Sequence, residues 1–278
     1  MGTQISSGSI SFVGDNSNNT PVSEVSMTTF TSFDGTKLYY EEQGTGAPVV
    51  LLHGLSVDVD GNWKTPGIWS ALVEAGHRVI GFDARGHGRS DKPHEPSAYE
   101  DDAMVRDVGT MLDELSLQET DLVGYSMGAS TALQFAARDD RLRRLVLGGI
   151  GGDPKAWGTP DGERALMGKR WLAGLEAKDP DRIEDPVARR ARKVFAARGN
   201  DLEAIAALLR SSRRHLSSEM ASAAVTVPTL VVCGDRDASP TELAAALPNA
   251  EALVLDGDHE SVVGNPELAQ SIVRFLGH

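Results

Sequence analysis

The chain has 278 residues, a formal net charge of −13 and one cysteine, Cys233. The acidic charge disfavours binding to nucleic acid or to an anionic membrane, and a single cysteine excludes an internal disulfide framework. No stretch approaches the ~20 apolar residues of a transmembrane helix, and the N-terminus lacks the basic start and apolar run of a signal peptide. These features predict a cytoplasmic protein without nucleic-acid or membrane partners, and they leave its oligomeric state open.

The first part of the chain carries little structural signal. Residues 1–27 are rich in Ser, Asn, Gly and Thr and show no periodicity, so we expect a flexible leader there. From Thr28 onward, Asp34-Gly35 separates two strand-like runs. An Asp-Gly pair in that context predicts a β-hairpin.

The middle and end of the chain alternate between short apolar runs and helical patterns. The apolar runs, which suit strands buried on both faces, lie at residues 48–53, 78–83, 120–125, 142–148, 227–233 and 251–256. Apolar residues repeat at helical spacing over residues 104–115, 129–136 and 268–275. This alternation predicts a mostly parallel sheet covered by helices on both faces.

The alternation stops between residues 150 and 225. Three helical segments follow one another there, near 161–175, 186–198 and 201–212, and prolines punctuate them. The same stretch holds 14 Lys and Arg residues against 11 Asp and Glu residues, unlike the acidic remainder. We therefore expect residues 150–225 to form a helical cap, or lid, inserted into a core made of residues 28–149 and 226–278.

The strongest chemical signal is the run Gly124-Tyr125-Ser126-Met127-Gly128, which follows an apolar strand and precedes a helical pattern. A nucleophile on a sharp strand-to-helix turn needs small residues on either side, because the backbone folds back on itself. Such a turn exposes the Ser126 hydroxyl. It also directs the Met127 N–H toward the place where an oxyanion forms.

A second oxyanion donor is expected after an earlier strand. His53-Gly54 ends that strand, and the next backbone N–H is that of Leu55. His53 itself could be a base, but we favour a role in ordering the loop, because a later histidine fits the base better. The run Asp83-x-Arg85-Gly-x-Gly88 after the next strand favours a structural, hydrogen-bonded loop.

A base and an acid are expected later in the chain, in the order nucleophile, acid, histidine. Asp235 and Asp237 follow one strand, and His259 follows the next. Both positions lie at carboxyl ends of strands, where α/β sheets place their sites. His259 would take the Ser126 proton, and a carboxylate would hold the imidazole tautomer. The residues alone leave Asp235 and Asp237 as alternatives.

Together these motifs resemble the α/β-hydrolase superfamily, and most closely its small bacterial esterases. The resemblance covers roughly residues 28–278 and implies an α/β-hydrolase fold with a mostly parallel eight-stranded sheet and an inserted helical cap. It implies Asp237 as the acid, because the acid usually lies three residues after the glycine. It also implies that Leu55 and Met127 form the oxyanion hole and that the cap supplies the substrate pocket, for which Trp157 and Trp171 are the candidates.

The expected function is hydrolysis of carboxylic esters of small to medium acyl chains by a serine esterase. A lactonase, a carbon–carbon bond hydrolase or a perhydrolase would use the same triad, and a non-catalytic ligand receptor could reuse the fold. A serine at position 126 argues against epoxide hydrolase and dehalogenase chemistry, which need a carboxylate nucleophile. We expect no cofactor, and Cys233 alone cannot make a zinc site.

Overall fold

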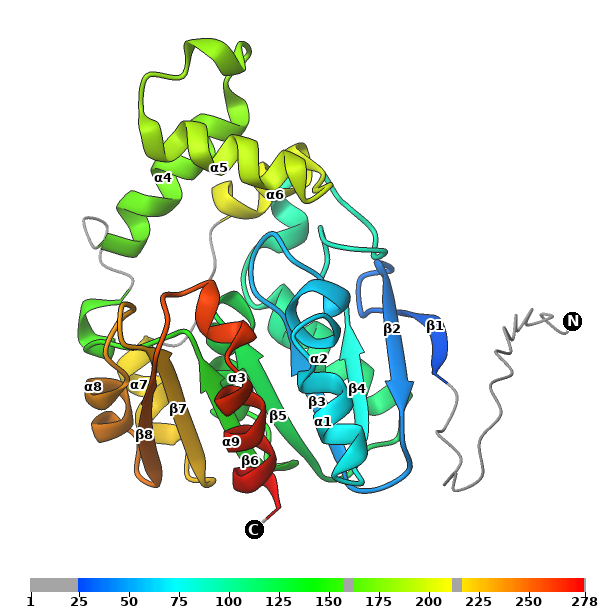
Figure 1. The fold of residues 1–278 in the computed structure, drawn as a ribbon. Coiled ribbons are helices and arrows are strands. Elements are labelled where there is room, and N and C mark those ends of the chain that lie inside the picture. Colours follow the sequence, from blue (N-terminus) through cyan, green and yellow to red (C-terminus); the bar gives the residue numbers. More distant parts are fainter. Residues whose placement is uncertain (1–24, 158–162, 212–216, 278) are drawn as a thin grey trace, which may run out of the picture.

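The structure, a computed structural model, describes residues 25–157, 163–211 and 217–277. Its centre is one eight-stranded sheet in the order β1-β2-β4-β3-β5-β6-β7-β8 (Figure 1). β1 and β2 pair antiparallel, as do β2 and β4, and the other pairs are parallel. The strands are β1 (Ser26–Thr31), β2 (Lys37–Gln43), β3 (Pro48–Leu52), β4 (Arg78–Phe82), β5 (Thr120–Tyr125), β6 (Leu142–Gly148), β7 (Thr229–Gly234) and β8 (Ala250–Leu255).

The expected sheet is thus confirmed, including the hairpin around Asp34 and Gly35. β1 begins at Ser26, so two residues grouped with the leader belong to the sheet, and the leader up to residue 24 lies outside the described residues. Every residue of β5 and β7 is buried. Both strands lie inside the sheet and are covered on both faces, which explains their continuous apolar runs.

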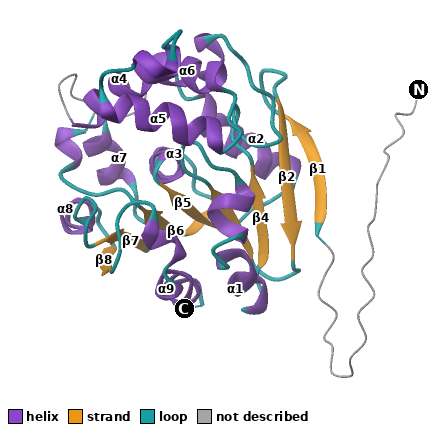
Figure 2. Ribbon diagram, turned by 45° about the horizontal axis from the view of Figure 1, so that its top comes forward, coloured by secondary structure: helices purple, strands orange, loops and turns teal. Residues whose placement is uncertain are grey.

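Helices cover both faces of the sheet (Figure 2). One face carries the two helices α1 (Ile68–Glu74) and α9 (Pro266–Leu276), whose apolar side chains join those of the sheet in one core cluster. The other face carries α2 (Ala103–Glu114), α3 (Met127–Ala136), α7 (Ser218–Ala224) and α8 (Pro240–Ala246). The sequence pattern did not predict α1 or α8, because seven residues show too little periodicity.

Three helices form a cap above one end of the sheet: α4 (Glu163–Glu176), α5 (Pro186–Ala197) and α6 (Leu202–Arg210) (Figure 1). Asp185 and Asp201 begin α5 and α6 by accepting hydrogen bonds from backbone N–H groups of the first helical turn. Short helical turns lie at Asp60–Lys64, Pro96–Tyr99, Pro154–Ala156, Pro180–Arg182 and Ser261–Gly264.

α7 was expected within the cap, but it packs against α3 and α8. Ala221 of α7 and Val225 after it are buried in the sheet cluster, so this end of the expected cap belongs with the core. α6 rests on the core through the turn Pro96–Tyr99. Ala207 and Leu208 of α6 are buried with Tyr99 and Met104.

The loop after β4 is built from buried polar groups, which confirms its structural role. Asp83 accepts hydrogen bonds from the N–H groups of Val59 (2.9 Å) and Arg89 (2.8 Å). Arg85, fully buried, forms two hydrogen bonds with Asp107, from Nε to Oδ2 (2.7 Å) and from Nη2 to Oδ1 (2.6 Å). A carboxylate that engages a guanidinium at two points fixes its orientation as well as its charge.

His87 is the ionisable group of this loop that should make stability depend on pH. Its ring is buried beside that of His53, with 5.1 Å between the ring centroids. Burial and the neighbouring His53 lower the pKa of His87 to about 3. The folded protein therefore keeps His87 neutral at pH values where the unfolded chain protonates it.

We expect the free energy of unfolding to fall as the pH drops from about 6.5 toward 3. Within that window the unfolded chain binds one more proton at His87 than the folded protein, a slope of up to ~1.4 kcal/mol per pH unit. Urea titrations between pH 7 and pH 4 on wild type and His87→Gln check this. His53 is present in both proteins, so equal slopes in the two titrations would contradict the assignment.

Candidate active site

The predicted site residues follow the carboxyl ends of neighbouring parallel strands. Leu55 follows β3, Ser126 follows β5, Asp237 follows β7 and His259 follows β8. Parallel strands end at one edge of the sheet, so residues far apart in sequence meet there. The cap lies over this edge (Figure 1).

Ser126 lies on a strained turn between β5 and α3. Its φ of 53° and ψ of −109° are rare for a residue with a side chain. A Cβ on Gly124 would approach the Gly128 carbonyl oxygen to 2.5 Å, and a Cβ on Gly128 would approach the Leu52 carbonyl oxygen to 2.0 Å. Both positions therefore require glycine, because α3 packs directly on β5 and β3.

The structure brings Ser126, His259 and Asp237 into one hydrogen-bonded row. His259 Nε2 lies 3.0 Å from Ser126 Oγ, and His259 Nδ1 lies 2.7 Å from Asp237 Oδ2. An ionised carboxylate only accepts, so Nδ1 carries the proton and Nε2 is left to accept from the serine hydroxyl. This is the arrangement of a nucleophile, a base and an orienting acid.

Asp235 has a different position from Asp237. Its Oδ1 accepts hydrogen bonds from the Gly257 N–H (2.9 Å) and from Arg236 Nη1 (3.0 Å). Asp235 therefore braces the loop that leads to His259 and leaves the imidazole to Asp237. Within the His259–Asp237 pair, the Asp237 side chain is the less exposed, at 14% against 45% for His259.

Tyr125 supports the site through a contact that the sequence did not predict, although it lies inside the serine motif. Its buried hydroxyl donates a hydrogen bond to the His259 carbonyl oxygen (2.7 Å). Burial, with the charge of Asp237 nearby, raises the pKa of Tyr125, so the hydroxyl stays a donor. Tyr125 thus fixes the backbone of His259 from the strand that carries Ser126.

Asp258, which directly precedes His259, fixes the shape of the loop after β8. Its Oδ1 accepts hydrogen bonds from the N–H of Ser261 (2.8 Å), the hydroxyl of Ser261 (2.7 Å) and the N–H of Glu260 (3.1 Å). These bonds, led by the one from the Ser261 N–H, lower the pKa of Asp258 to about 2. The loop is therefore closed by an ionised carboxylate through the neutral pH range.

Leu55 and Met127 are the predicted oxyanion donors, and Met127 directly follows Ser126 in the chain. Met127 is the first residue of α3, where a backbone N–H has no acceptor within the helix. Within the described residues, no hydrogen bond is recorded for the N–H of either residue. Both amides therefore remain available to a developing oxyanion.

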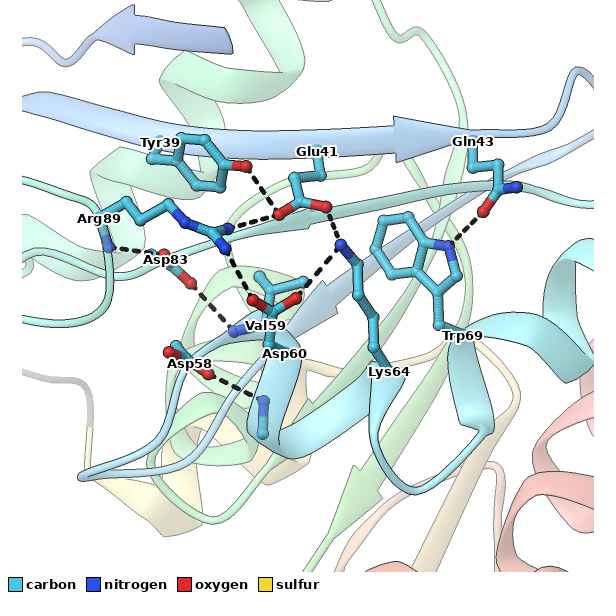
Figure 3. A network of polar contacts seen from close by, with 11 residues as sticks. Tyr39, Glu41, Gln43, Asp58, Val59, Asp60, Lys64, Trp69, Asp83 and Arg89 are labelled. Carbon is cyan, nitrogen blue, oxygen red and sulfur yellow. Dashed lines mark hydrogen bonds and ion pairs between the residues drawn. The ribbon is translucent and has the colours of Figure 1, made fainter. Parts of the chain in front are cut away.

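The loop that carries Leu55 is held by a polar network (Figure 3). Glu41 on β2, fully buried, bonds Tyr39, Lys64 and Arg89, and Arg89 also bonds Asp60. Nearer the site, the Oδ1 of Asn62 accepts from the Gly54 N–H (2.9 Å). No pattern in the sequence pointed to Asn62 or Glu41, since each acts through a contact made only in the fold.

His53 orders its loop, as favoured from the sequence. The Ala84 N–H donates to His53 Nε2 (2.9 Å), so Nδ1 carries the proton and donates to the Gly54 carbonyl oxygen (2.8 Å). Both ring nitrogens are engaged and the ring is buried. His259 therefore remains the candidate base.

The two cap tryptophans lie in different surroundings. Trp171 packs edge-on against Phe195 in a cluster that also includes Leu55. Trp157 packs against the sheet cluster and donates a hydrogen bond to the Gly151 carbonyl oxygen (3.0 Å).

A narrow apolar cavity beside Met127, with space for about one water molecule, is lined in part by Phe82, Ala84 and Met104.

None of the described helices is long and apolar enough to cross a membrane. Across residues 25–157, 163–211 and 217–277, no group of three or more His, Cys, Asp and Glu side chains could hold a metal ion.

Comparison with known proteins identifies the fold family. The alpha/beta hydrolase fold family matches residues 47–166. The 2-hydroxymuconate semialdehyde hydrolase of a Pseudomonas species is 30% identical over 218 residues, which cover 73% of this chain and 75% of that protein. This chain belongs to the α/β-hydrolase superfamily. The fold and family expected from the sequence are thereby confirmed.

Other α/β-hydrolases share parts of the chain. A putative non-heme chloroperoxidase of Synechocystis is 38% identical over 112 residues, covering 40% of this chain and 39% of that protein. The chain thus spans about two fifths of the length of this relative and of two further non-heme chloroperoxidases. The crystal structure of an enol-lactonase from Burkholderia xenovorans is 27% identical with a TM-score of 0.65, covering 90% of this chain and 100% of that one.

We expect Asp237→Asn to slow the reaction of Ser126 with a fluorophosphonate by about 10³-fold or more, because an amide holds the wrong imidazole tautomer. Asp235→Asn is the matched control and should slow it far less. The labelling rate reports activation of the nucleophile without requiring a known substrate. A larger loss in Asp235→Asn, at equal thermal stability, would reverse the two roles.

Proposed function

We propose that the protein is a serine hydrolase that cleaves carboxylic esters of small to medium acyl chains through an acyl-enzyme intermediate. The observation that carries the proposal is the row from Ser126 Oγ through His259 to Asp237, with distances of 3.0 and 2.7 Å. A serine hydroxyl is a weak nucleophile until an adjacent base takes its proton, and this geometry supplies the base.

In the proposed reaction, Ser126 Oγ attacks the acyl carbonyl while His259 Nε2 takes the hydroxyl proton. The N–H groups of Leu55 and Met127 stabilise the oxyanion. The carbon–oxygen bond to the alcohol then breaks, and the alcohol leaves with the proton from His259. Water attacks the acyl-enzyme with His259 again as base and releases the acid.

A perhydrolase is the second candidate, and the names of three relatives favour it. Each is called a non-heme chloroperoxidase, and in a perhydrolase hydrogen peroxide would replace water as the acyl acceptor. Lactone or carbon–carbon bond hydrolysis would also use the same triad. The acceptor separates the first two functions: peracid formed from an ester and peroxide marks a perhydrolase, whereas carboxylic acid alone marks an esterase.

Two other functions fit the site less well. An epoxide hydrolase or a dehalogenase needs a carboxylate nucleophile, and residue 126 is a serine. A ligand receptor on this fold would have no need of the ordered row at Ser126, His259 and Asp237. A receptor would bind ester analogues without releasing product.

We expect Ser126→Ala to lower turnover of p-nitrophenyl acetate by at least ~10³-fold, since loss of a serine nucleophile can cost up to ~10⁶. Steady-state rates, with folding checked by circular dichroism, measure the loss. His53→Gln serves as a comparison, because His53 only orders a loop. This substitution should not abolish the labelling of Ser126 by a fluorophosphonate. Near-native turnover by folded Ser126→Ala would rule out the mechanism.

We also expect Trp171→Ala to shift the preferred acyl length toward longer chains. Trp171 shares a cluster with Leu55, so its removal opens space beside the proposed oxyanion site. One methylene in an apolar pocket is worth ~1–3 kcal/mol, so the preference should change while the chemistry persists. The measurement is kcat/KM over p-nitrophenyl esters from C2 to C12.

Trp157→Ala is the matched control for that series. Both tryptophans were cap candidates for the pocket wall, but Trp157 packs against the sheet cluster. A shift in Trp157→Ala alone would place the acyl pocket on the other side of the cap. An unchanged profile in both variants would make both tryptophans packing residues.

A further inference from the structure

Two side chains of the cap reach the loop that follows β3. Arg198, which ends α5, donates from Nη1 to the hydroxyl oxygen of Ser56 (3.0 Å). Two residues later, Asn200 Nδ2 donates to the Ser56 carbonyl oxygen (3.0 Å). The cap therefore holds both the side chain and the backbone of Ser56, the residue directly after Leu55.

Ser56 has a backbone conformation that needs such support. Its φ of 65° lies in the left-handed region, which residues with a side chain rarely adopt, and only 2% of the residue is exposed. A strained conformation persists only when its surroundings over-determine it. Asn62 holds Gly54 on one side of Leu55, and the cap holds Ser56 on the other.

The same guanidinium reaches the histidine loop. Arg198 Nη2 lies 3.3 Å from Glu260 Oε2, and Glu260 directly follows His259. The Glu260 side chain is 59% exposed, so this ion pair contributes little stability by itself. The contact with the buried Ser56 is therefore the more consequential of the two.

We propose that Arg198 is a positioning residue through which the cap completes the active site. By holding Ser56, it sets the direction of the Leu55 N–H toward the oxyanion, and by pairing with Glu260 it links that loop to the His259 loop. This inference rests on the proposed function, because an oxyanion donor has a role only if Ser126 attacks a carbonyl. Arg198 itself need not touch the substrate.

A positioning role has kinetic consequences that a packing role lacks. An oxyanion donor acts on the transition state, so disturbing its direction lowers kcat and leaves KM little changed. Loss of a whole oxyanion donor costs ~10²–10³ in kcat, and misdirecting one costs a part of that. We expect Arg198→Met to lose about 10- to 100-fold in kcat.

The test compares Arg198→Met, Ser56→Ala and the double variant on p-nitrophenyl acetate. Both single changes break the hydrogen bond between Arg198 and Ser56, and the pair with Glu260 is lost in Arg198→Met and in the double variant alike. If Arg198 acts through Ser56, the double variant therefore loses no more in kcat than the worse single variant. Arg198→Lys should recover part of kcat by donating to Ser56 with one ammonium. Arg190→Met is the matched control, since Arg190 is an exposed arginine on the same helix.

Inhibition by 1,1,1-trifluoroacetone gives a second readout. In the proposed mechanism its adduct with Ser126 places an oxyanion between the N–H groups of Leu55 and Met127. The affinity for this ketone should fall in Arg198→Met in proportion to kcat and stay unchanged in Arg190→Met. Equal kcat in Arg198→Met and Arg190→Met, or additive losses in the double variant, would overturn the positioning role alone. A wild type that turns over no ester and leaves Ser126 unlabelled by fluorophosphonate would overturn the proposed function and this inference together.

Discussion

The site depends on one close approach of backbone to backbone, where α3 turns back over β5 and β3. Gly124 and Gly128 leave no room for a Cβ there, and Ser126 takes a strained conformation between them. A serine elsewhere on this strand would project from one face of the sheet and be buried beneath the helices. The turn instead presents its hydroxyl at the edge of the sheet and puts the Met127 N–H at the start of a helix beside it. Strain of this kind is tolerated because buried strands on both sides fix the junction.

The remaining parts of the site are loops tied to that junction. The Tyr125 hydroxyl bonds the His259 carbonyl oxygen, so the strand that ends in the nucleophile also locates the imidazole. Asp235 bonds Gly257 from the neighbouring loop, and Asp237 is left to face His259. Each contact joins residues at or after the ends of different strands. Small shifts in one loop therefore change distances on which proton transfer depends.

Apolar packing is one of the contacts that attach the cap to the core. Ala207 and Leu208 of α6 are buried with Tyr99 and Met104, and Leu55 and Met127 pack against the same cluster. The side chains of the two residues proposed as oxyanion donors thus pack against the same cluster as the cap helix α6. A change in the cap is therefore transmitted by direct packing to the residues beside Ser126. Relatives with different names are similar to parts of this chain, as expected when one fold carries different functions.

The amino-acid sequence was enough to predict the architecture and to propose Ser126 as the nucleophile. Buried parallel strands leave continuous apolar runs, and a strand-to-helix turn leaves its glycines in the chain, so both are local signals. It left Asp235 and Asp237 as alternatives, because two carboxylates in one turn look alike until their partners are known. Only the tertiary structure separated them, and only it revealed Tyr125, Asn62 and Arg198 as neighbours of the site. Their contacts join segments between 8 and 142 residues apart in the chain, and no local pattern encodes such a pairing. The seven-residue helices α1 and α8 and the placement of α7 on the sheet were decided by packing for the same reason.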